Sequence, residues 1–273
     1  MRHAFDADTA AGFGAASGWA PGISLETFAR ASHELRQPLS GILGHVAALR
    51  RTGLGEDEQG KRLLHIQRAA HHMAQVLDAA LELSAIVFSS VNGASELVDA
   101  AEQAQQVADM LRPLAEAKGI ALVATPVAGS AVCMASRRRL TQVLLNLVGN
   151  AVQHCGRGAT VTVSVACADG RWLMLDVADD GPGIEPYHLA RLFQPFYRVP
   201  PCLGKPSPPT EGDEEARAHP FGSSRAGGEA GEGTSGLGLA IVRALVLQMG
   251  GEVEVSSTPG RGTRFGVRIP RVG

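Results

Sequence analysis

Residues that could bind a nucleotide lie in several short stretches of the sequence. In DDGPGI at 179–184, Asp179 is followed by Gly181 and Gly183. Glycines allow a tight turn and a close approach of the backbone to a ligand. The Asp179 carboxylate could accept a hydrogen bond from an exocyclic amino group such as that of adenine. Taken alone, such a pattern is more often an ordinary strand-to-loop turn.

A second glycine-containing stretch, GTSGLGLAIV at 233–242, places Gly236 and Gly238 at the start of an apolar helix. Backbone N–H groups at a helix N-terminus attract anions, and glycines let a phosphate come close. The stretch lacks the GK[ST] of a Walker A loop and the preceding strand of a Rossmann fingerprint. The alternative is a glycine-rich helix cap without a ligand.

Two amides and an arginine complete this candidate chemistry. Asn146 and Asn150 are four residues apart and share one helix face, where unpaired amides would be costly in a dry core. Their oxygens could bind Mg²⁺. In LFQPFYR at 192–198, Phe193 and Phe196 could anchor a segment from which Arg198 reaches a phosphate. Paired amides and core aromatics are the alternatives.

A proline interrupts a helical pattern in SHELRQPLSG at 32–41, five residues after His33. Pro38 lacks the N–H that would bond the carbonyl of Glu34, and an interior proline costs about 3 kcal/mol. Two interpretations stay open. The bend eases deformation of the helix beside His33, or it adjusts packing alone.

The composition is that of a soluble globular protein. Of 273 residues, 45% are hydrophobic and 19% are charged, and the net charge of −2 argues against nucleic acid as a partner. No window is apolar enough to predict a membrane span. The four cysteines (Cys133, Cys155, Cys167 and Cys202) show no metal-ligand spacing, so we expect reduced thiols in a cytoplasmic protein.

Two heptad patterns begin the ordered part of the chain. Apolar residues recur at alternating steps of three and four from Leu25 to Leu49 and from Leu63 to Val87, with RTGLGED between them. This spacing predicts a hairpin of two long helices. Because one hairpin cannot bury both seams, we expect a homodimer with a four-helix bundle.

The remaining pattern predicts an α+β domain, with helices on one face of a mixed sheet. We expect a helix around Leu97–Lys118, strands in GIALVATP and AVCMA that alternate like a pair, and a helix at 137–154 capped by Ser136. Two strands around Asp169–Gly170 follow, and then a helix from Leu237 and two closing strands. Residues 199–233, rich in Pro, Gly, Ser and acidic residues, predict a mobile lid.

The order of these motifs resembles that of the sensor histidine kinases of two-component systems, whose catalytic domain is of the gyrase/Hsp90 type. LLNLVGNAVQH resembles the N box, DDGPGI and TSGLGLAIV the first two glycine boxes, LFQPFYR the F box and GRGTRF the last glycine box. FARASHELRQPLS resembles the phospho-acceptor H box. The resemblance covers about residues 24–270.

This resemblance implies roles for individual residues. His33 would accept the γ-phosphoryl group of ATP, Glu34 would orient its ring and take its proton, and Gln37 could orient a water for phosphatase activity. His33 lies one position off the seam, so we expect an exposed ring. His65, His71 and His72 we expect to be surface residues. The nucleotide would be held by Asn146, Asn150, His154, Asp179, Gly181, Gly183, Phe196, Arg198, Ser235, Gly236, Leu237, Gly238 and Thr263, with Asn150 as the Mg²⁺ ligand.

Four features depart from the family pattern. Gln153 replaces a common Lys, Ala135–Ser136 stand where Asp is usual, Gln37 replaces Thr or Asn, and the lid is long and acidic. The lid could slow nucleotide exchange, bind a regulator or do nothing.

The sequence thus predicts three parts, a flexible segment at 1–23, a dimerisation and phospho-acceptor domain at 24–90, and an ATP-binding domain at 95–273. We expect a kinase that autophosphorylates His33 and passes the phosphoryl group to an aspartate of a response-regulator receiver domain. Input would come from a partner or from a region absent from this chain. The alternatives are a pseudokinase that binds ATP or a receiver domain as a regulatory dimer, and a serine kinase or ATPase of the same superfamily.

Overall fold

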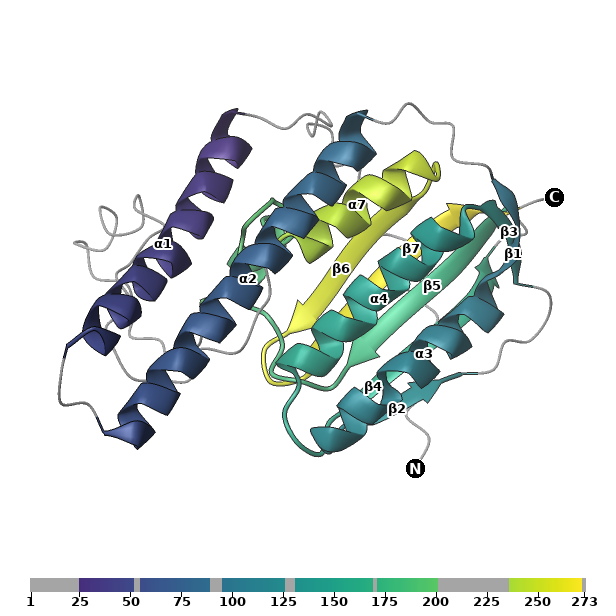
Figure 1. Ribbon diagram of the computed structural model, residues 1–273. Coiled ribbons are helices and arrows are strands. Elements are labelled where there is room, and N and C mark those ends of the chain that lie inside the picture. The colour runs from purple at the N-terminus through teal and green to yellow at the C-terminus, as the bar shows by residue number, and fades with distance from the viewer. Residues whose placement is uncertain are drawn as a thin grey trace, which may run out of the picture.

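The computed structural model describes residues 25–51, 55–88, 95–125, 131–168, 171–200 and 236–271. Two long antiparallel helices, α1 (Leu25–Leu49) and α2 (Glu56–Phe88), form the predicted hairpin (Figure 1). The connection between the helices is shorter than the predicted RTGLGED stretch, because α2 already begins at Glu56. Three carboxylates in its first turn favour this start, since they face the positive end of the helix dipole.

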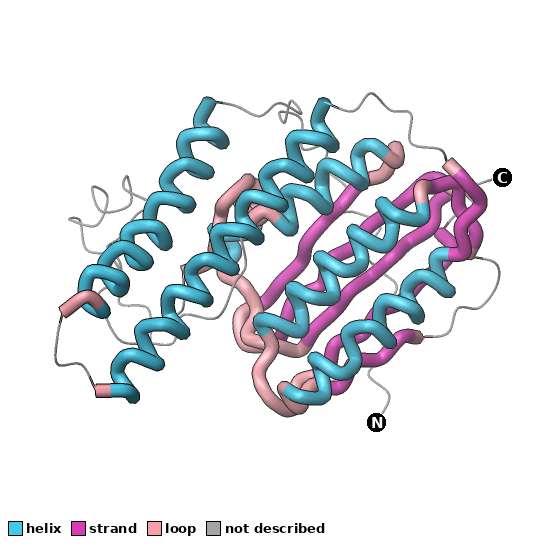
Figure 2. Tube along the Cα trace, in the orientation of Figure 1, coloured by secondary structure: helices cyan, strands magenta, loops and turns pink. Residues whose placement is uncertain are grey.

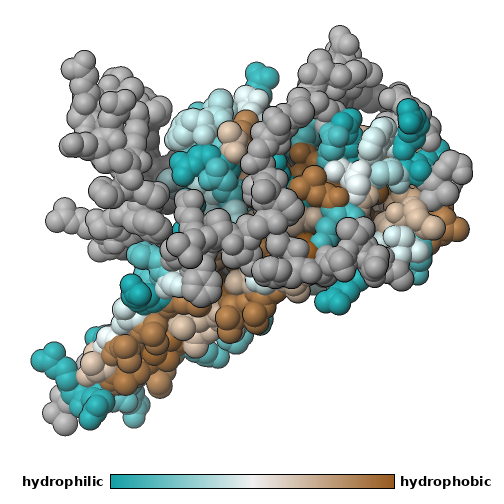
Figure 3. All heavy atoms as spheres, turned by 90° about the horizontal axis from the view of Figure 1, so that it is seen from above, coloured by the Kyte–Doolittle hydropathy of each residue, from teal (hydrophilic) through white to brown (hydrophobic). Residues whose placement is uncertain are grey.

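Many large apolar side chains of the hairpin remain exposed. Figure 3 shows them as a brown surface along the projecting arm. Leu43 is 61% exposed and Leu63 is 57% exposed, and the others are Leu39, Val46, Leu64, Leu77 and Leu81. Exposed apolar side chains gathered on one surface in this way indicate an interaction site.

The residues from 95 to 271, here called the sheet domain, are built on a five-stranded sheet in the order β2-β4-β5-β7-β6. The strands are β2 (Ala121–Ala124), β4 (Thr160–Ala168), β5 (Trp172–Asp179), β6 (Glu252–Thr258) and β7 (Gly262–Pro270). Strand β2 pairs parallel with β4, and all other pairs are antiparallel. The predicted mixed sheet is confirmed.

Helices α3 (Ala100–Ala117), α4 (Arg137–His154) and α7 (Gly238–Gln248) cover one face of this sheet (Figures 1 and 2). Leu140, Leu144 and Leu147 of α4 are fully buried, as are Leu173 and Leu175 of β5. Each such leucine contributes roughly 1.5–3 kcal/mol through burial. Helix α4, which carries both candidate asparagines, is therefore held firmly against the sheet.

Two details of the predicted order were wrong. Residues Leu97–Asp99 belong to strand β1 (Glu96–Asp99), and the helix after it begins at Ala100. Asp99 ends the strand because its Oδ1 accepts hydrogen bonds from the amides of Ala101 and Glu102, at 2.9 and 3.2 Å, as an N-cap.

Strand β3 (Val132–Ala135), within AVCMA, also departs from expectation. It pairs antiparallel with β1 in a separate two-stranded sheet, whereas β2, within GIALVATP, joins the main sheet. Alternation alone cannot choose a partner strand. Ser136 is the N-cap residue of α4, as expected, but its side chain makes no capping hydrogen bond.

The hairpin and the sheet domain share a packed contact. Leu83 and Ile86 of α2 belong to the same buried core as the residues of α4 and α7, and Figure 1 shows α2 lying between α1 and α7. The Gln248 side chain of α7 donates a hydrogen bond to the carbonyl of Ile86. The end of α2 is thus part of the sheet domain's core.

Among the described residues, Cys133, Cys155 and Cys167 form no disulfide, and Cys202 lies outside the described residues. The part of the chain that the structure describes contains no helix long and apolar enough to cross a bilayer.

Candidate functional site

Asp179 is half-buried at the last position of β5, directly opposite Thr263 of β7. Its Oδ1 accepts a hydrogen bond from the amide of Gly181 at 2.9 Å. Burial raises the pKa of this carboxyl, while the bond from Gly181 opposes the rise. Thr263 is 8% exposed, and its hydroxyl lies 3.0 Å from that of Ser257. The predicted pair of Asp179 and Thr263 is therefore held together by strand pairing.

Cys155, which the sequence reasoning missed, adjoins this carboxylate. Its thiol donates a hydrogen bond to Asp179, and burial together with that carboxylate raises the pKa of the thiol to about 12. A Cβ at Gly181 would lie 2.8 Å from Asp179 Oδ1 and 2.9 Å from Cys155 Sγ. Glycine is required there because the thiol and the carboxylate take the space. The available signal was the position of Cys155, immediately after the N-box helix.

The turn after β5 depends on two further glycines. Gly183 has a φ of +70°, and a Cβ there would lie 2.2 Å from the carbonyl oxygen of Thr258. Gly262 has a φ of +108°, and its Cβ would lie 1.9 Å from the carbonyl oxygen of Asp179. Both positions exclude other residues, so the glycines keep the backbone close around Asp179.

The predicted asparagines lie along α4, where the start of α7 meets it. Asn146 is half-buried, its Nδ2 has no hydrogen-bond partner, and its Oδ1 would lie 3.3 Å from a Cβ at Gly238. An amide without a partner in this position fits an acceptor on a ligand. Asn150 is also half-buried, one turn further, and His154 is exposed at the last residue of the helix.

The F box and the second glycine box meet through the backbone. The amide of Phe196 donates to the carbonyl of Gly236 at 2.8 Å, and their φ angles are +62° and +67°. Leu237, which follows, is fully buried. Tyr197 is held by a hydrogen bond to buried His188 and by Arg191, whose guanidinium lies 4.6 Å from the ring centroid. His188 belongs to the short helix α5 (Pro186–Leu189).

Phe193 packs edge-on against Phe265 in the core, with 6.4 Å between the ring centroids.

Ser235 and most of the predicted lid at 199–233 lie outside the described residues.

The predicted phospho-acceptor site faces this region. His33 and Gln37 are exposed on α1, as expected for the ring. Between them, Glu34 Oε2 lies 3.7 Å from Arg198 Nη2, and the Glu34 side chain is only 17% exposed. Two predicted site residues that are 164 positions apart in the sequence are thus brought together.

His72 of α2 lies at the same junction, and the expectation of a plain surface residue was wrong for it. The ring is half-buried, and its Nδ1 is buried without a hydrogen-bond partner. Burial first, and Arg198 second, lower the pKa of His72, while Glu34 opposes them. His71 is exposed, and His65 is exposed and stacks on His45 at 5.1 Å.

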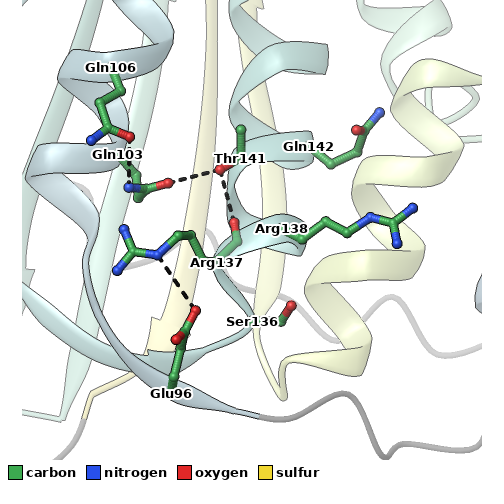
Figure 4. Close-up of a pocket in the computed structure, with 8 residues that line it drawn as sticks. All are labelled: Glu96, Gln103, Gln106, Ser136, Arg137, Arg138, Thr141 and Gln142. Atoms are coloured by element: carbon green, nitrogen blue, oxygen red, sulfur yellow. Dashed lines mark hydrogen bonds and ion pairs between the residues drawn. The ribbon is translucent and has the colours of Figure 1, made fainter.

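A separate open hollow of about 540 Å³ lies between α3 and the start of α4 (Figure 4). Several of its polar groups interact with one another. The Thr141 hydroxyl donates to Gln103 at 2.9 Å, Gln103 donates to Gln106 at 3.0 Å, and Arg137 lies 3.5 Å from Glu96. This hollow contains none of the predicted site residues.

Comparisons with known proteins identify the family of this chain. Residues 24–87 match the family described as His Kinase A (phospho-acceptor) domain. Residues 135–273 match the family described as histidine kinase-, DNA gyrase B- and HSP90-like ATPase. The chain belongs to the sensor histidine kinases.

Similar curated histidine kinases are longer proteins. The autoinducer 2 sensor kinase/phosphatase LuxQ of Vibrio parahaemolyticus is 31% identical over 89% of this chain and 26% of its own length. Histidine protein kinase DivJ of Caulobacter vibrioides is 33% identical over 89% of this chain and 36% of its own length. The chain therefore spans about a third or less of the length of these relatives.

Solved histidine kinase structures share the fold. Full-length ShkA in complex with AMPPNP is 28% identical, with a TM-score of 0.59 over 91% of this chain and 46% of ShkA. Histidine kinase ThkA in complex with response regulator protein TrrA has a TM-score of 0.67 at 18% identity, over 92% of this chain and 62% of that one. The latter likeness concerns the fold.

Proposed function

We propose that this chain is the kinase core of a two-component system, which autophosphorylates His33 with ATP and passes the phosphoryl group to an aspartate of a response regulator. The observation that carries the proposal is the 3.7 Å approach of Arg198 to Glu34, beside exposed His33. Arg198, proposed to contact the nucleotide, thereby lies next to Glu34, proposed to assist the acceptor His33.

The nucleotide would lie between β5, α4 and the start of α7. Asp179 would accept the adenine amino group, with Thr263 acting through water and Gly181 and Gly183 close to the base. The amide of Asn146 without a partner and the backbone of Gly236, Leu237 and Gly238 suit phosphate oxygens.

The Asn150 oxygen, half-buried beside that phosphate site, fits Mg²⁺. Bound there, the ion would neutralise charge on the β- and γ-phosphates. His154, exposed at the end of α4, would contribute at the margin of the pocket.

Transfer to His33 would depend on positioning and charge rather than on covalent help from the protein. Glu34 would orient the imidazole and take its proton. Arg198 would leave Glu34 to neutralise the transferring group. Gln37, exposed one turn further along α1, could orient a water for dephosphorylating the regulator.

The partners follow from the same reasoning. A second copy would cover the apolar face of the hairpin to make a four-helix bundle. ThkA, a structural neighbour, was solved with a response regulator, and we propose a receiver domain as the partner of this chain too. We propose the cytoplasm as the site of action and, for the domains, the ranges 24–90 and 95–273.

Labelling with γ-³²P ATP tests this function. We expect acid-labile, base-stable label on the protein, lost in His33→Ala and kept in His71→Ala, which changes another exposed histidine of the hairpin. Label that persists in His33→Ala would exclude His33 as the acceptor, and acid-stable label would indicate a serine kinase. ATP binding without any label would favour the pseudokinase, for which Gln153 in place of a phosphate-binding Lys is an argument.

A further inference from the structure

Which subunit of a dimer receives the phosphoryl group is set by where the sheet domain rests on the hairpin. We infer that the nucleotide bound in one chain phosphorylates His33 of that same chain. This inference rests on the proposed function and adds the identity of the acceptor.

The first support is the face of α2 that carries the sheet domain. Val76, Leu83 and Ile86 are at most 8% exposed, and together with His72 they recur at steps of four, seven and three residues. Such steps place them on one side of a helix. Leu83 and Ile86 belong to the core of the sheet domain, so this side of α2 faces the sheet domain of the same chain.

The opposite side of α2 is free for a second copy. Leu63, Leu77 and Leu81 are 49–59% exposed. At 100° per residue, Leu63 and Leu81 lie about half a turn from His72, and Leu77 lies about 140° from it. On α1, Leu43 has the same relation to Glu34, nine residues earlier. A partner seated on these leucines lies across the hairpin from the sheet domain. Its own His33 is therefore the more distant acceptor.

The second support is the junction at Glu34. This residue of α1, His72 of α2 and Arg198 of the sheet domain come together within a single chain. Since His33 adjoins Glu34 on α1, the chain's own acceptor is next to its own nucleotide-side arginine.

The connection between the hairpin and the sheet domain is short. From Phe88 to Ser95 the chain advances seven residues, which span at most about 25 Å even when fully extended. A short connection keeps the sheet domain beside the hairpin that precedes it, so the contact of Arg198 with Glu34 need not span a long linker.

In the transfer itself, a lone pair on the neutral His33 imidazole attacks the γ-phosphorus of ATP, forming the N–P bond. The bond from that phosphorus to the bridging oxygen breaks, and its electron pair leaves on ADP. The proton on the other ring nitrogen passes to Glu34 of the same chain.

Mixed dimers separate the two routes. Two differently tagged full-length chains, His33→Ala and Asn150→Ala, are co-expressed, and the heterodimer is isolated through both tags. Transfer within a chain predicts less than about 5% of the wild-type label, because the chain that binds nucleotide lacks the acceptor. Transfer between chains predicts about half the wild-type label on the Asn150→Ala chain and would overturn the inference.

Three controls make every outcome decisive. A wild-type/Asn150→Ala heterodimer must carry label on the wild-type chain under the intrachain route and on the other chain under the interchain route. Asp179→Asn replaces Asn150→Ala if that variant fails to fold. If the protein is monomeric, a labelling rate per chain independent of protein concentration supports the inference, and a rate that rises with concentration contradicts it.

Crosslinking gives a readout that does not depend on activity. Glu34→Cys and Arg198→Cys are introduced together, in a chain with Cys167→Ser and Cys202→Ser, and treated with a short bis-maleimide. We expect a crosslinked single chain on a denaturing gel, and the parent without the new cysteines should give none. A crosslinked dimer instead would contradict the inference. Absence of any label in the wild type, by contrast, would defeat the proposed function and not this contact.

Discussion

At the scale of residues, the carboxylate of Asp179 is oriented by its neighbours. Oδ1 takes a hydrogen bond from the Gly181 amide, and the Cys155 thiol donates another. The thiol remains protonated at neutral pH because its pKa is raised to about 12. Cys155 thus acts as a permanent donor that fixes the direction in which Asp179 presents its remaining lone pairs.

Removing that donor should weaken ATP binding. We expect Cys155→Val to raise the Kd for ATP about 5–10-fold, the equivalent of one hydrogen bond of about 1 kcal/mol. Cys155→Ser keeps a donor and should stay within about twofold of the wild type. Calorimetric titration measures both. Equal affinity of the valine variant and the wild type would show that the thiol does not orient Asp179.

Much of this site could be predicted from the sequence. Asp179, the asparagines and the glycines stand in an order that belongs to one family, and Gly183 and Gly262 have positive φ angles and backbone atoms where a Cβ would lie. Cys155 and His72 could not be predicted, because their importance comes from contacts with residues 24 and more than 100 positions away. A lone cysteine or a helical histidine carries no such information in its local sequence.

At the scale of elements, α2 serves two surfaces at once. Its heptad seam, which includes Leu63 and Leu77, was evident in the sequence, while the stripe of His72, Val76 and Leu83 was not. The second stripe gives a weaker pattern because its large apolar residues are fewer and a histidine stands at its start. The strand β1 was missed for a similar reason, since four residues give no clear period.

The histidine at this junction should make docking of the sheet domain depend on pH. The pKa of His72 is lowered by burial and by Arg198, so the docked state favours the neutral ring. As the pH falls through the ordinary value near 6.5, the undocked state takes up the proton first and docking weakens. Docking is therefore strongest above this range.

The crosslink between Glu34→Cys and Arg198→Cys would disturb this junction, so hydrogen exchange is the better measurement. We expect amides around Glu34 to exchange faster at about pH 5.5 than at about pH 8, after correction for intrinsic rates. His72→Gln should remove that difference and His71→Gln should keep it. The same pH dependence in both variants would assign the effect to another group.

A glycine at the turn of β7 gives a test of the backbone geometry. At Gly262 a Cβ would lie 1.9 Å from the Asp179 carbonyl oxygen, at a φ of +108°. We expect Gly262→Ala to destabilise the protein by about 2 kcal/mol or more. Gly60→Ala, in open space on α2, should stabilise it by about 0.5–1 kcal/mol. Denaturant unfolding measures the stability of both variants. Equal stability of the two would show that position 262 does not require glycine.

At the scale of the whole molecule, the exposed leucines of the hairpin predict a dimer. Leu43 and Leu63 would each be buried by a second copy, which contributes roughly 1.5–3 kcal/mol per side chain. We expect Leu43→Lys and Leu63→Lys each to raise the dissociation constant of the dimer tenfold or more. Leu247→Lys, on exposed α7 surface, is the control. Sedimentation equilibrium that shows no change in any variant would place the interface elsewhere.

The hydrogen bond from Phe196 to Gly236 has a consequence for engineering. It holds together two positions that are 40 residues apart in the sequence, so the backbone geometry at these two motifs does not depend on the length of the connection between them. Lengthening a connection of this kind adds little to the entropic cost of closing it, about 0.6 kcal/mol for each doubling of its length. An epitope or a small fluorescent reporter could therefore be inserted near the middle of this connection.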